Sequence, residues 1–356
     1  MKFKTGILLL MTGLSGCQLE PDYAHVDTTS LTETNQQQLL ETKKAILSLD
    51  SNKVRTLLTE IDVNAALPDD SRLLAWAIET QTPALVDLLL ENGAKVNVAG
   101  GNRFSPLIQA CRYGNSAIIN ALLQKGANVQ SAIEDGTSAF HLCAASASGD
   151  TLARMIKAGA EVNATNTYGQ TPLMFAANAG NVNNLTLLLD AGADINQQTQ
   201  EGYSALFFAI KSQHLDAVKA AIARGADVLH SAQDGTTVSQ LAVYTSNFEF
   251  LTWFAKTMPS LLAKEAINTQ LTAYDRDGYQ LLHQAVKANK PELVSALLAL
   301  GADPSAMSKP SRLKWRYEAN FKTQSYLPPQ LTPFEIAEKN KLEHIAALLR
   351  NSSTKI

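Results

Sequence analysis

The sequence predicts an all-α repeat solenoid, in which short helical hairpins stack side by side into one elongated body. A Gly-Ala pair recurs with a period of 33 residues and returns once more after a longer interval. The glycines of these pairs are Gly93, Gly126, Gly159, Gly192, Gly225 and Gly301. A second landmark, which reads Thr171-Pro172-Leu173 in its fullest form, recurs with the same period. Such a period is typical of repeat arrays, in which each unit contacts only its neighbours.

These landmarks resemble the ankyrin repeat, whose pattern reads DGxTPLHxAAxxGxxxxVxxLLxxGAdxN. The turn pair is present as Asp135-Gly136, Asp234-Gly235 and Asp277-Gly278. The helix-opening run is present as Ser105-Pro106-Leu107, Ser138 to Ala144 and Ser204-Ala205-Leu206. The resemblance implies an ankyrin array of about 8–9 helix-turn-helix repeats with β-hairpin fingers, covering roughly residues 35–352.

Each element of the pattern has a physical role. The Asp-Gly pair forms the tight turn at the tip of a finger. The Thr caps the first helix, and Pro fits the first turn, where no backbone donor is needed. Small Ala residues let neighbouring helices approach, and the Gly of each Gly-Ala pair ends the second helix in a left-handed conformation. The Asn four residues later, present as Asn97, Asn163 and Asn196, is expected to tie the following loop.

Counting from these landmarks divides the array. An N-terminal cap is expected at 35–68 and repeats at 69–328, with insertions near 258–272 and 309–328. A C-terminal cap follows at 329–352. Repeats begin near residues 69, 102, 135, 168 and 201. A degenerate one, with Ser239 where Leu is expected, begins near 234, and an eighth unit begins near 277.

The N-terminal sequence predicts a signal peptide for export. Lys2 and Lys4 precede an apolar stretch that is too short to span a membrane. Leu14-Ser15-Gly16-Cys17 then resembles the bacterial lipobox, which implies a signal peptide at 1–16, lipidation of Cys17 and a flexible tether at 17–34. Gln18, by the same resemblance, favours sorting to the outer membrane. The alternatives are an ordinary secretory signal with a chance cysteine, and a leader strand packed on the array in place of the tether.

Composition excludes some classes of function. The formal net charge is −3, and removing the two signal-peptide lysines leaves 28 basic and 33 acidic side chains. A mildly acidic body argues against nucleic acid as a partner. After residue 17, no apolar run approaches the roughly 20 residues of a spanning helix. Membrane attachment is therefore expected through the lipid anchor.

Two insertions interrupt the period. Near 258–272, Met258-Pro259 replaces Gly-Ala and an added helical turn is expected, either as filler or as a binding element. At 309–328 the inserted segment is basic and aromatic. It includes Trp315, Arg316 and Tyr317. This segment could contact an acidic partner, lipid headgroups or a glycan, or it could seal the last repeat against the C-terminal cap.

No pattern for catalysis, a metal or another cofactor is found, so an enzyme is not expected. His141 and His283 occupy the TPLH position, where the resemblance implies hydrogen bonds to neighbouring loops. Cys111 and Cys143 lie at small-residue positions of adjacent repeats, one position out of phase. Because packed helices lie about 8–10 Å apart and a disulfide needs Cα atoms within about 7 Å, we expect two buried free thiols.

The function expected is protein binding by a periplasm-facing, outer-membrane-anchored lipoprotein with a monomeric body. Ankyrin arrays bind through the concave side, formed by finger tips and first helices. Exposed aromatic and Arg side chains are typical interface anchors. The tip residues expected to contact the partner are Arg103, Phe104, Tyr168, Gln170, Tyr203 and Tyr279. The alternatives are an immunity or chaperone-type partner of a secreted or periplasmic lipase-like enzyme, and an envelope protein that binds lipid or glycan.

Overall fold

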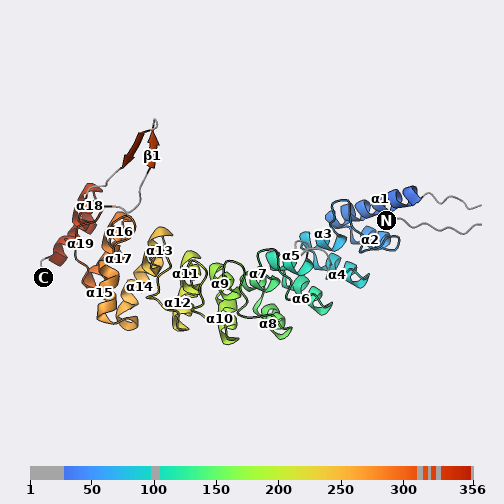
Figure 1. Cartoon of the computed structure of the whole chain (residues 1–356), viewed down its shortest axis with the longest axis horizontal. Helices are drawn as coiled ribbons and strands as arrows, with labels where there is room; N and C mark the ends of the chain where they lie inside the picture. The colour runs from blue at the N-terminus through green and yellow to red at the C-terminus, as the bar shows by residue number, and fades with distance from the viewer. Residues whose placement is uncertain (1–27, 98–104, 311–315, 320–321, 326–329, 354–356) are drawn as a thin grey trace, which may run out of the picture.

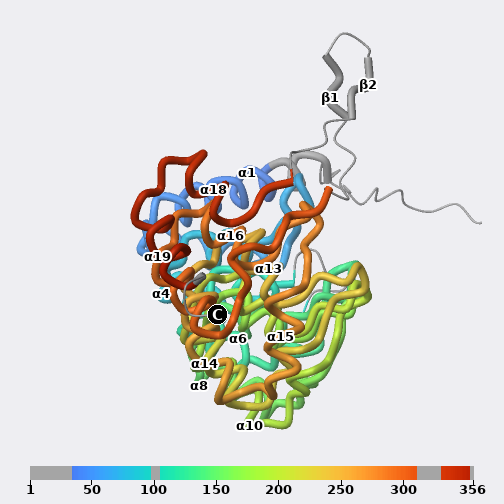
Figure 2. Tube along the Cα trace, turned by 90° about the vertical axis from the view of Figure 1, so that its left-hand side faces the viewer, coloured from blue at the N-terminus to red at the C-terminus, as the bar shows by residue number. Residues whose placement is uncertain are grey.

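The computed structural model describes residues 28–97, 105–310, 316–319, 322–325 and 330–353. In these ranges, nine helix pairs stack along one axis in chain order, and each first helix packs against the first helix of the next pair. Figure 1 shows the result as a curved array with the first helices on its inner side and the second helices on its outer side. Seen along its length, the array is a single column of repeats (Figure 2).

The first helices are α1 Thr28–Leu47, α3 Leu73–Glu79, α5 Pro106–Tyr113, α7 Ala139–Ser146, α9 Pro172–Asn178, α11 Ala205–Lys211, α13 Val238–Tyr244, α16 Leu281–Lys287 and α18 Pro333–Lys339. The second helices are α2 Ser51–Leu57, α4 Pro83–Glu91, α6 Ser116–Gln124, α8 Gly149–Lys157, α10 Val182–Asp190, α12 Leu215–Ala223, α14 Phe248–Leu261, α17 Pro291–Ala299 and α19 Glu343–Ser353. The predicted all-α repeat solenoid is confirmed. Helix α1 begins inside the expected tether of residues 17–34, and residues 17–27 lie outside the described part.

The local sequence explains where the helices begin and end. In α9, the Thr171 hydroxyl accepts the backbone N–H of Met174, and Pro172 occupies the first helical position. In the preceding finger turn, Gly169 has a φ of 75°, and a Cβ there would lie 3.1 Å from the Cα of Thr199 in the next finger. Glycine is therefore required both for the turn and for the close approach of successive fingers.

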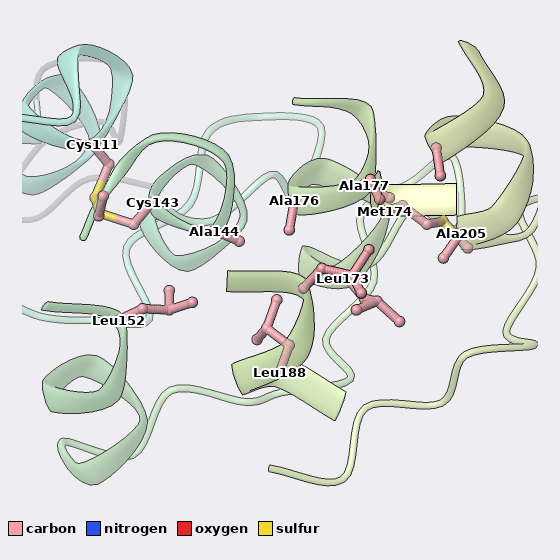
Figure 3. Close-up of a cluster of buried hydrophobic side chains, with 14 of the residues drawn as sticks. Cys111, Cys143, Ala144, Leu152, Leu173, Met174, Ala176, Ala177, Leu188 and Ala205 are labelled. Atoms are coloured by element: carbon pink, nitrogen blue, oxygen red, sulfur yellow. A yellow bond between two sulfur atoms is a disulfide. The ribbon is translucent and has the colours of Figure 1, made fainter. Parts of the chain in front are cut away.

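Three sets of contacts join successive repeats. Small buried residues such as Ala144, Ala176 and Ala177 bring the first helices together, and Leu152 and Leu188 of the second helices fill the core (Figure 3). Asn side chains form the second set. Asn163 donates to the Gly192 carbonyl at 3.0 Å and accepts the Asp194 N–H at 3.0 Å. Asn97 and Asn196 bond in the same way, which confirms the predicted role of these residues.

Backbone bonds between neighbouring fingers are the third set. The Thr167, Gln200 and Gln233 N–H groups donate to the carbonyls of Asp135, Tyr168 and Glu201 at 2.8, 3.1 and 2.9 Å, respectively. At the next finger this pattern changes, because the Arg276 N–H donates to the Tyr244 hydroxyl at 3.2 Å. The Asn contacts stop one joint earlier, because Leu229 stands where Asn is expected and is 47% exposed.

The expectation of two free thiols was wrong. Cys111 of α5 and Cys143 of α7 form a disulfide with a Cα–Cα distance of 4.6 Å (Figure 3). The 8–10 Å separation applies to helix axes, and subtracting two Cα radii of about 2.3 Å leaves roughly 3–5 Å between facing Cα atoms. The one-position offset between the cysteines matches the way adjacent first helices face each other.

Both insertions form regular structure. Helix α14 continues through Pro259, and an additional helix, α15 Lys264–Thr272, follows it. The second insertion contains two antiparallel strands, β1 Arg316–Ala319 and β2 Lys322–Ser325. The inserted α15 provides a polar partner for the degenerate seventh repeat, because the buried Ser239 hydroxyl donates to Gln270 Oε1 at 3.0 Å.

Candidate functional site

The inner side of the array carries a row of large side chains, one from each of six successive helix pairs. They are the fourth residues of successive first helices, which we call the inner row: Trp76, Gln109, Leu142, Phe175, Phe208 and Leu241. All six are half-buried. The five apolar members pack on the core with one face and remain partly accessible with the other. The row is apolar without interruption from Leu142 to Leu241, over four consecutive repeats.

One helical turn further from the fingers lies a second row, formed by the seventh residues of the same helices. Its charged members are Glu79, Arg112 and Lys211, and all three are exposed. Glu79 accepts hydrogen bonds from Gln109 Nε2 and the Tyr113 hydroxyl. Within the described residues, no carboxylate lies within ion-pair distance of Lys211. Beside the apolar stretch from Leu142 to Leu241, Lys211 is therefore the one charged residue of this second row.

Two hollows open between successive members of the inner row. The hollow nearer the C-terminus is about 210 Å³ and is lined by Tyr203, Phe207, Phe208, Lys211, Leu241 and Thr245. The one nearer the N-terminus is about 290 Å³, and its lining includes Trp76, Glu79, Gln109 and Arg112. The first has a mainly apolar lining with one cation, whereas the second combines an indole with charged and amide groups.

The fingers border the inner row on its other side and are mainly acidic between residues 134 and 234. Glu134, Glu201 and Asp234 are exposed and Asp135 is half-buried. Burial raises the pKa of the Tyr203 hydroxyl, and the nearby charges of Asp234 and Glu201 raise it further. These two carboxylates thus act on a tyrosine that lines the C-terminal hollow.

The predicted tip residues differ in their surroundings. Tyr168 is 52% exposed. The Gln170 side chain is engaged within its own finger, where its Oε1 accepts from Asn166 Nδ2 at 3.0 Å. Tyr203 and Tyr279 are half-buried against the core, and the Lys287 ammonium lies 4.1 Å from the centre of the Tyr279 ring.

Several predicted contact residues cannot be placed in this way. Arg103, Phe104 and Trp315 lie outside the described residues, as does the predicted lipidation site Cys17. Arg316 and Tyr317 belong to β1 and pair with Ser325 and Gln324 of β2. Among the predicted contact residues that the structure describes, Tyr203 is the one that lines the apolar hollow.

The two TPLH histidines are structural. His141 Nε2 lies 3.1 Å from the Gln170 carbonyl, and His283 Nε2 lies 3.1 Å from the Leu331 carbonyl, as the resemblance implied. Burial lowers the pKa of both imidazoles. Across the described part of the chain, no three His, Cys, Asp or Glu side chains are grouped closely enough to hold a metal ion.

The inner row was missed by reasoning from sequence, which favoured the finger tips. The signal was present, because the residue after the TPLH position is Leu142, Phe175, Phe208 and Leu241 in four successive repeats. A first helix buries its small-residue face, and its fourth residue lies beside the finger. A large apolar residue repeated at that position indicates an accessible row.

Comparison with known families agrees with this architecture. The family model for three copies of the ankyrin repeat matches residues 44–133 and 140–232, and a single-repeat model matches residues 277–306. No curated protein matches the chain. The matched segments cover more than half of the sequence and coincide with helix pairs of the array. The chain belongs to the ankyrin-repeat family.

Proposed function

We propose that this protein is a non-enzymatic lipoprotein that binds a protein partner on the concave face of its ankyrin array. Ankyrin repeats indicate a protein–protein interaction module. The observation that carries the proposal is the continuous apolar inner row, with a hollow beside Phe208. A half-exposed apolar row bordered by charged groups has the composition of an interface core with a polar rim.

The proposed anchor is Cys17 in the lipobox-like sequence, which holds the body on the periplasmic side of the outer membrane. Acyl chains contribute about 0.8 kcal/mol per buried methylene, so several chains hold a protein at a membrane. None of the described helices is both long and apolar enough to cross a bilayer. The Cys111–Cys143 disulfide supports export, because disulfides persist mainly in oxidising compartments.

The anchor is tested by fractionation of cells that express the chain with Cys17→Ser. We expect the wild type in the outer-membrane fraction and the variant in the soluble periplasmic fraction. The Cys111→Ala/Cys143→Ala variant serves as the control, because it removes both cysteines of the array and leaves no unpaired thiol. Retention of Cys17→Ser in the membrane fraction would contradict the proposed anchor.

Partner binding is tested by chemical crosslinking of the full chain in its own envelope, followed by affinity purification. The Phe175→Ala/Phe208→Ala variant should lose the crosslinked partner, because both substitutions remove contact area from the inner row. Leu261→Ala removes a side chain that is 40% exposed on α14, and should retain the partner. Circular dichroism of both variants checks that the array remains folded. An unchanged crosslink with the inner-row variant would refute concave-face binding.

A further inference from the structure

The inner row defines the shape of the segment that it receives. The helices α7, α9, α11 and α13 pack in sequence, and packed helices lie about 8–10 Å apart. Leu142, Phe175, Phe208 and Leu241 occupy the same position in these helices, so they repeat at roughly this interval along the concave face. An occupant that contacts all four needs apolar side chains with the same spacing.

An α-helix meets this requirement and an extended strand does not. Seven residues of α-helix rise about 10.5 Å and return to nearly the same face. In a strand, residues on one face are about 6.6 or 13 Å apart, because alternate side chains point to opposite faces. The spacing of the inner row therefore fits one side chain from each heptad of a helix laid along the array.

The two borders of the row differ in charge. On the finger side, between residues 134 and 234, lie Glu134, Asp135, Glu201 and Asp234. On the helix side the seventh-residue row carries Lys211, and Arg112 and Glu79 lie in the two repeats before Leu142. Arg276 stands over the Tyr244 ring at 4.0 Å, beyond the last of these acidic fingers. A helix bound from Leu142 to Leu241 thus faces several carboxylates along one edge and the single ammonium of Lys211 along the other.

We propose that the concave face receives one amphipathic helix of the partner protein, lying along the array. Its apolar residues recur every seventh position and contact the inner row from Leu142 to Leu241. One enters the hollow between Phe208 and Leu241, which is large enough for part of a Leu or Phe side chain. Its basic edge faces the finger carboxylates, and its acidic edge faces Lys211. This inference rests on the proposed function and specifies the partner segment.

The direct test uses synthetic peptides and the full mature chain, with binding measured by fluorescence anisotropy. The probe is a four-heptad helical peptide with Leu at one heptad position, Lys on one neighbouring edge and Glu on the other. We expect saturable binding of this peptide and much weaker binding of a scrambled peptide with the same composition. Equal binding of both peptides, or no saturable binding of the designed one, would overturn the proposal.

Variants of the chain test the two edges and the hollow. Glu201→Gln with Asp234→Asn removes two charges, and Asn at 234 keeps an oxygen for the Thr236 N–H that Asp234 accepts at 2.9 Å. This double variant should weaken binding by about fivefold, the effect expected for two exposed ion pairs. Phe208→Ala should weaken it at least about tenfold, because it removes a central apolar contact. Asp87→Asn on the outer helix α4 is the matched control and should have no effect.

The native partner provides the second test. A photo-crosslinking residue is placed at 142, 175, 208 or 241 in the full chain, and the crosslinked sites on the partner are mapped by mass spectrometry. We expect successive positions to react with sites seven residues apart in one partner segment. Sites two to four residues apart, or in unrelated segments, would overturn the helix but leave concave-face binding intact. If none of the four positions crosslinks a partner, the proposed function itself fails.

Discussion

The joints between repeats are built differently in the middle of the array and around α15. Between residues 135 and 232, successive repeats share small-residue helix contacts and finger backbone bonds, and Asn side chains bridge their loops. Between the repeats that begin near 234 and 277, the regular finger bond is replaced, and the described residues there form no Asn contact of this kind. In their place α15 contributes side-chain bonds, including Ser239 to Gln270, and Gln280 Nε2 donates to the Thr272 carbonyl at 3.2 Å.

The same contrast is visible at the two TPLH histidines. His141 Nδ1 lies 2.8 Å from the Ser138 hydroxyl and 3.2 Å from the Ser138 N–H, so both ring nitrogens have partners. His283 Nδ1 is buried without a partner, because Gln280 stands where the capping Ser or Thr belongs. The array therefore accommodates an inserted helix by changing several side-chain partners at once, and it leaves one nitrogen unsatisfied.

Of the changes that test this difference between the joints, removing the disulfide should lower the free energy of unfolding most. The Cys111→Ala/Cys143→Ala variant loses a cross-link over 32 residues and should unfold with about 3 kcal/mol less free energy than the oxidised wild type. Ala is the residue found at the equivalent positions 176 and 177, so packing is preserved. The measurement is urea-induced unfolding followed by circular dichroism.

Reduced wild-type protein is the matched control and should resemble the double Ala variant. Labelling of unfolded, unreduced protein with a thiol reagent should find Cys111 and Cys143 unreactive. Two reactive thiols per chain would show that the cross-link is absent and that the middle of the array depends on packing alone.

Breaking the polar contact of α15 should have an intermediate effect. Gln270→Met leaves the buried Ser239 hydroxyl without its acceptor, which costs about 1–3 kcal/mol. Adding Ser239→Ala should recover part of this loss, because both polar partners are then gone. Urea unfolding of the single and double variants measures the coupling, and simple additivity would show that the bond does not contribute.

Exchanging the caps should have the smallest effect. Gln280→Thr provides a hydroxyl for the N-terminus of α16 and for His283, and should stabilise the array by up to about 1 kcal/mol. The gain is limited because the bond from Gln280 to Thr272 is lost. The reverse change, Ser138→Gln in the middle repeat, should destabilise by a similar amount. Thermal unfolding compares the two, and an unaffected Ser138→Gln variant would refute the role of the cap.

Much of the fold could be predicted from sequence because local chemistry repeats with the period. Thr171, Pro172 and Gly192 specify a helix start, a first turn and a helix end without reference to distant residues. The role of Asn163 followed from its fixed distance from a Gly-Ala pair. The same regularity predicts which residues lie at the finger tips, and Tyr168 is exposed there as expected.

The remaining features depend on how one repeat faces the next. The disulfide required knowing which side of α5 meets α7, and axis separation was an inadequate guide to Cα separation. Ser239 looked degenerate by itself, because its partner Gln270 lies in an insertion with no counterpart in other repeats. The inner row is a property of four helices together, and each of its residues looks ordinary in isolation.

The bond between Cys111 and Cys143 also sets how this chain responds to mechanical force. A solenoid pulled from its two ends lengthens as repeats detach one after another. The segment between the two cysteines spans 32 residue steps and cannot extend while the bond is intact. At 3.3–3.6 Å per residue, the fully stretched chain is therefore shorter by about 110 Å. A protease that cuts once between these cysteines leaves both fragments covalently joined, so the N-terminal and C-terminal parts of the array stay together until the bond is reduced.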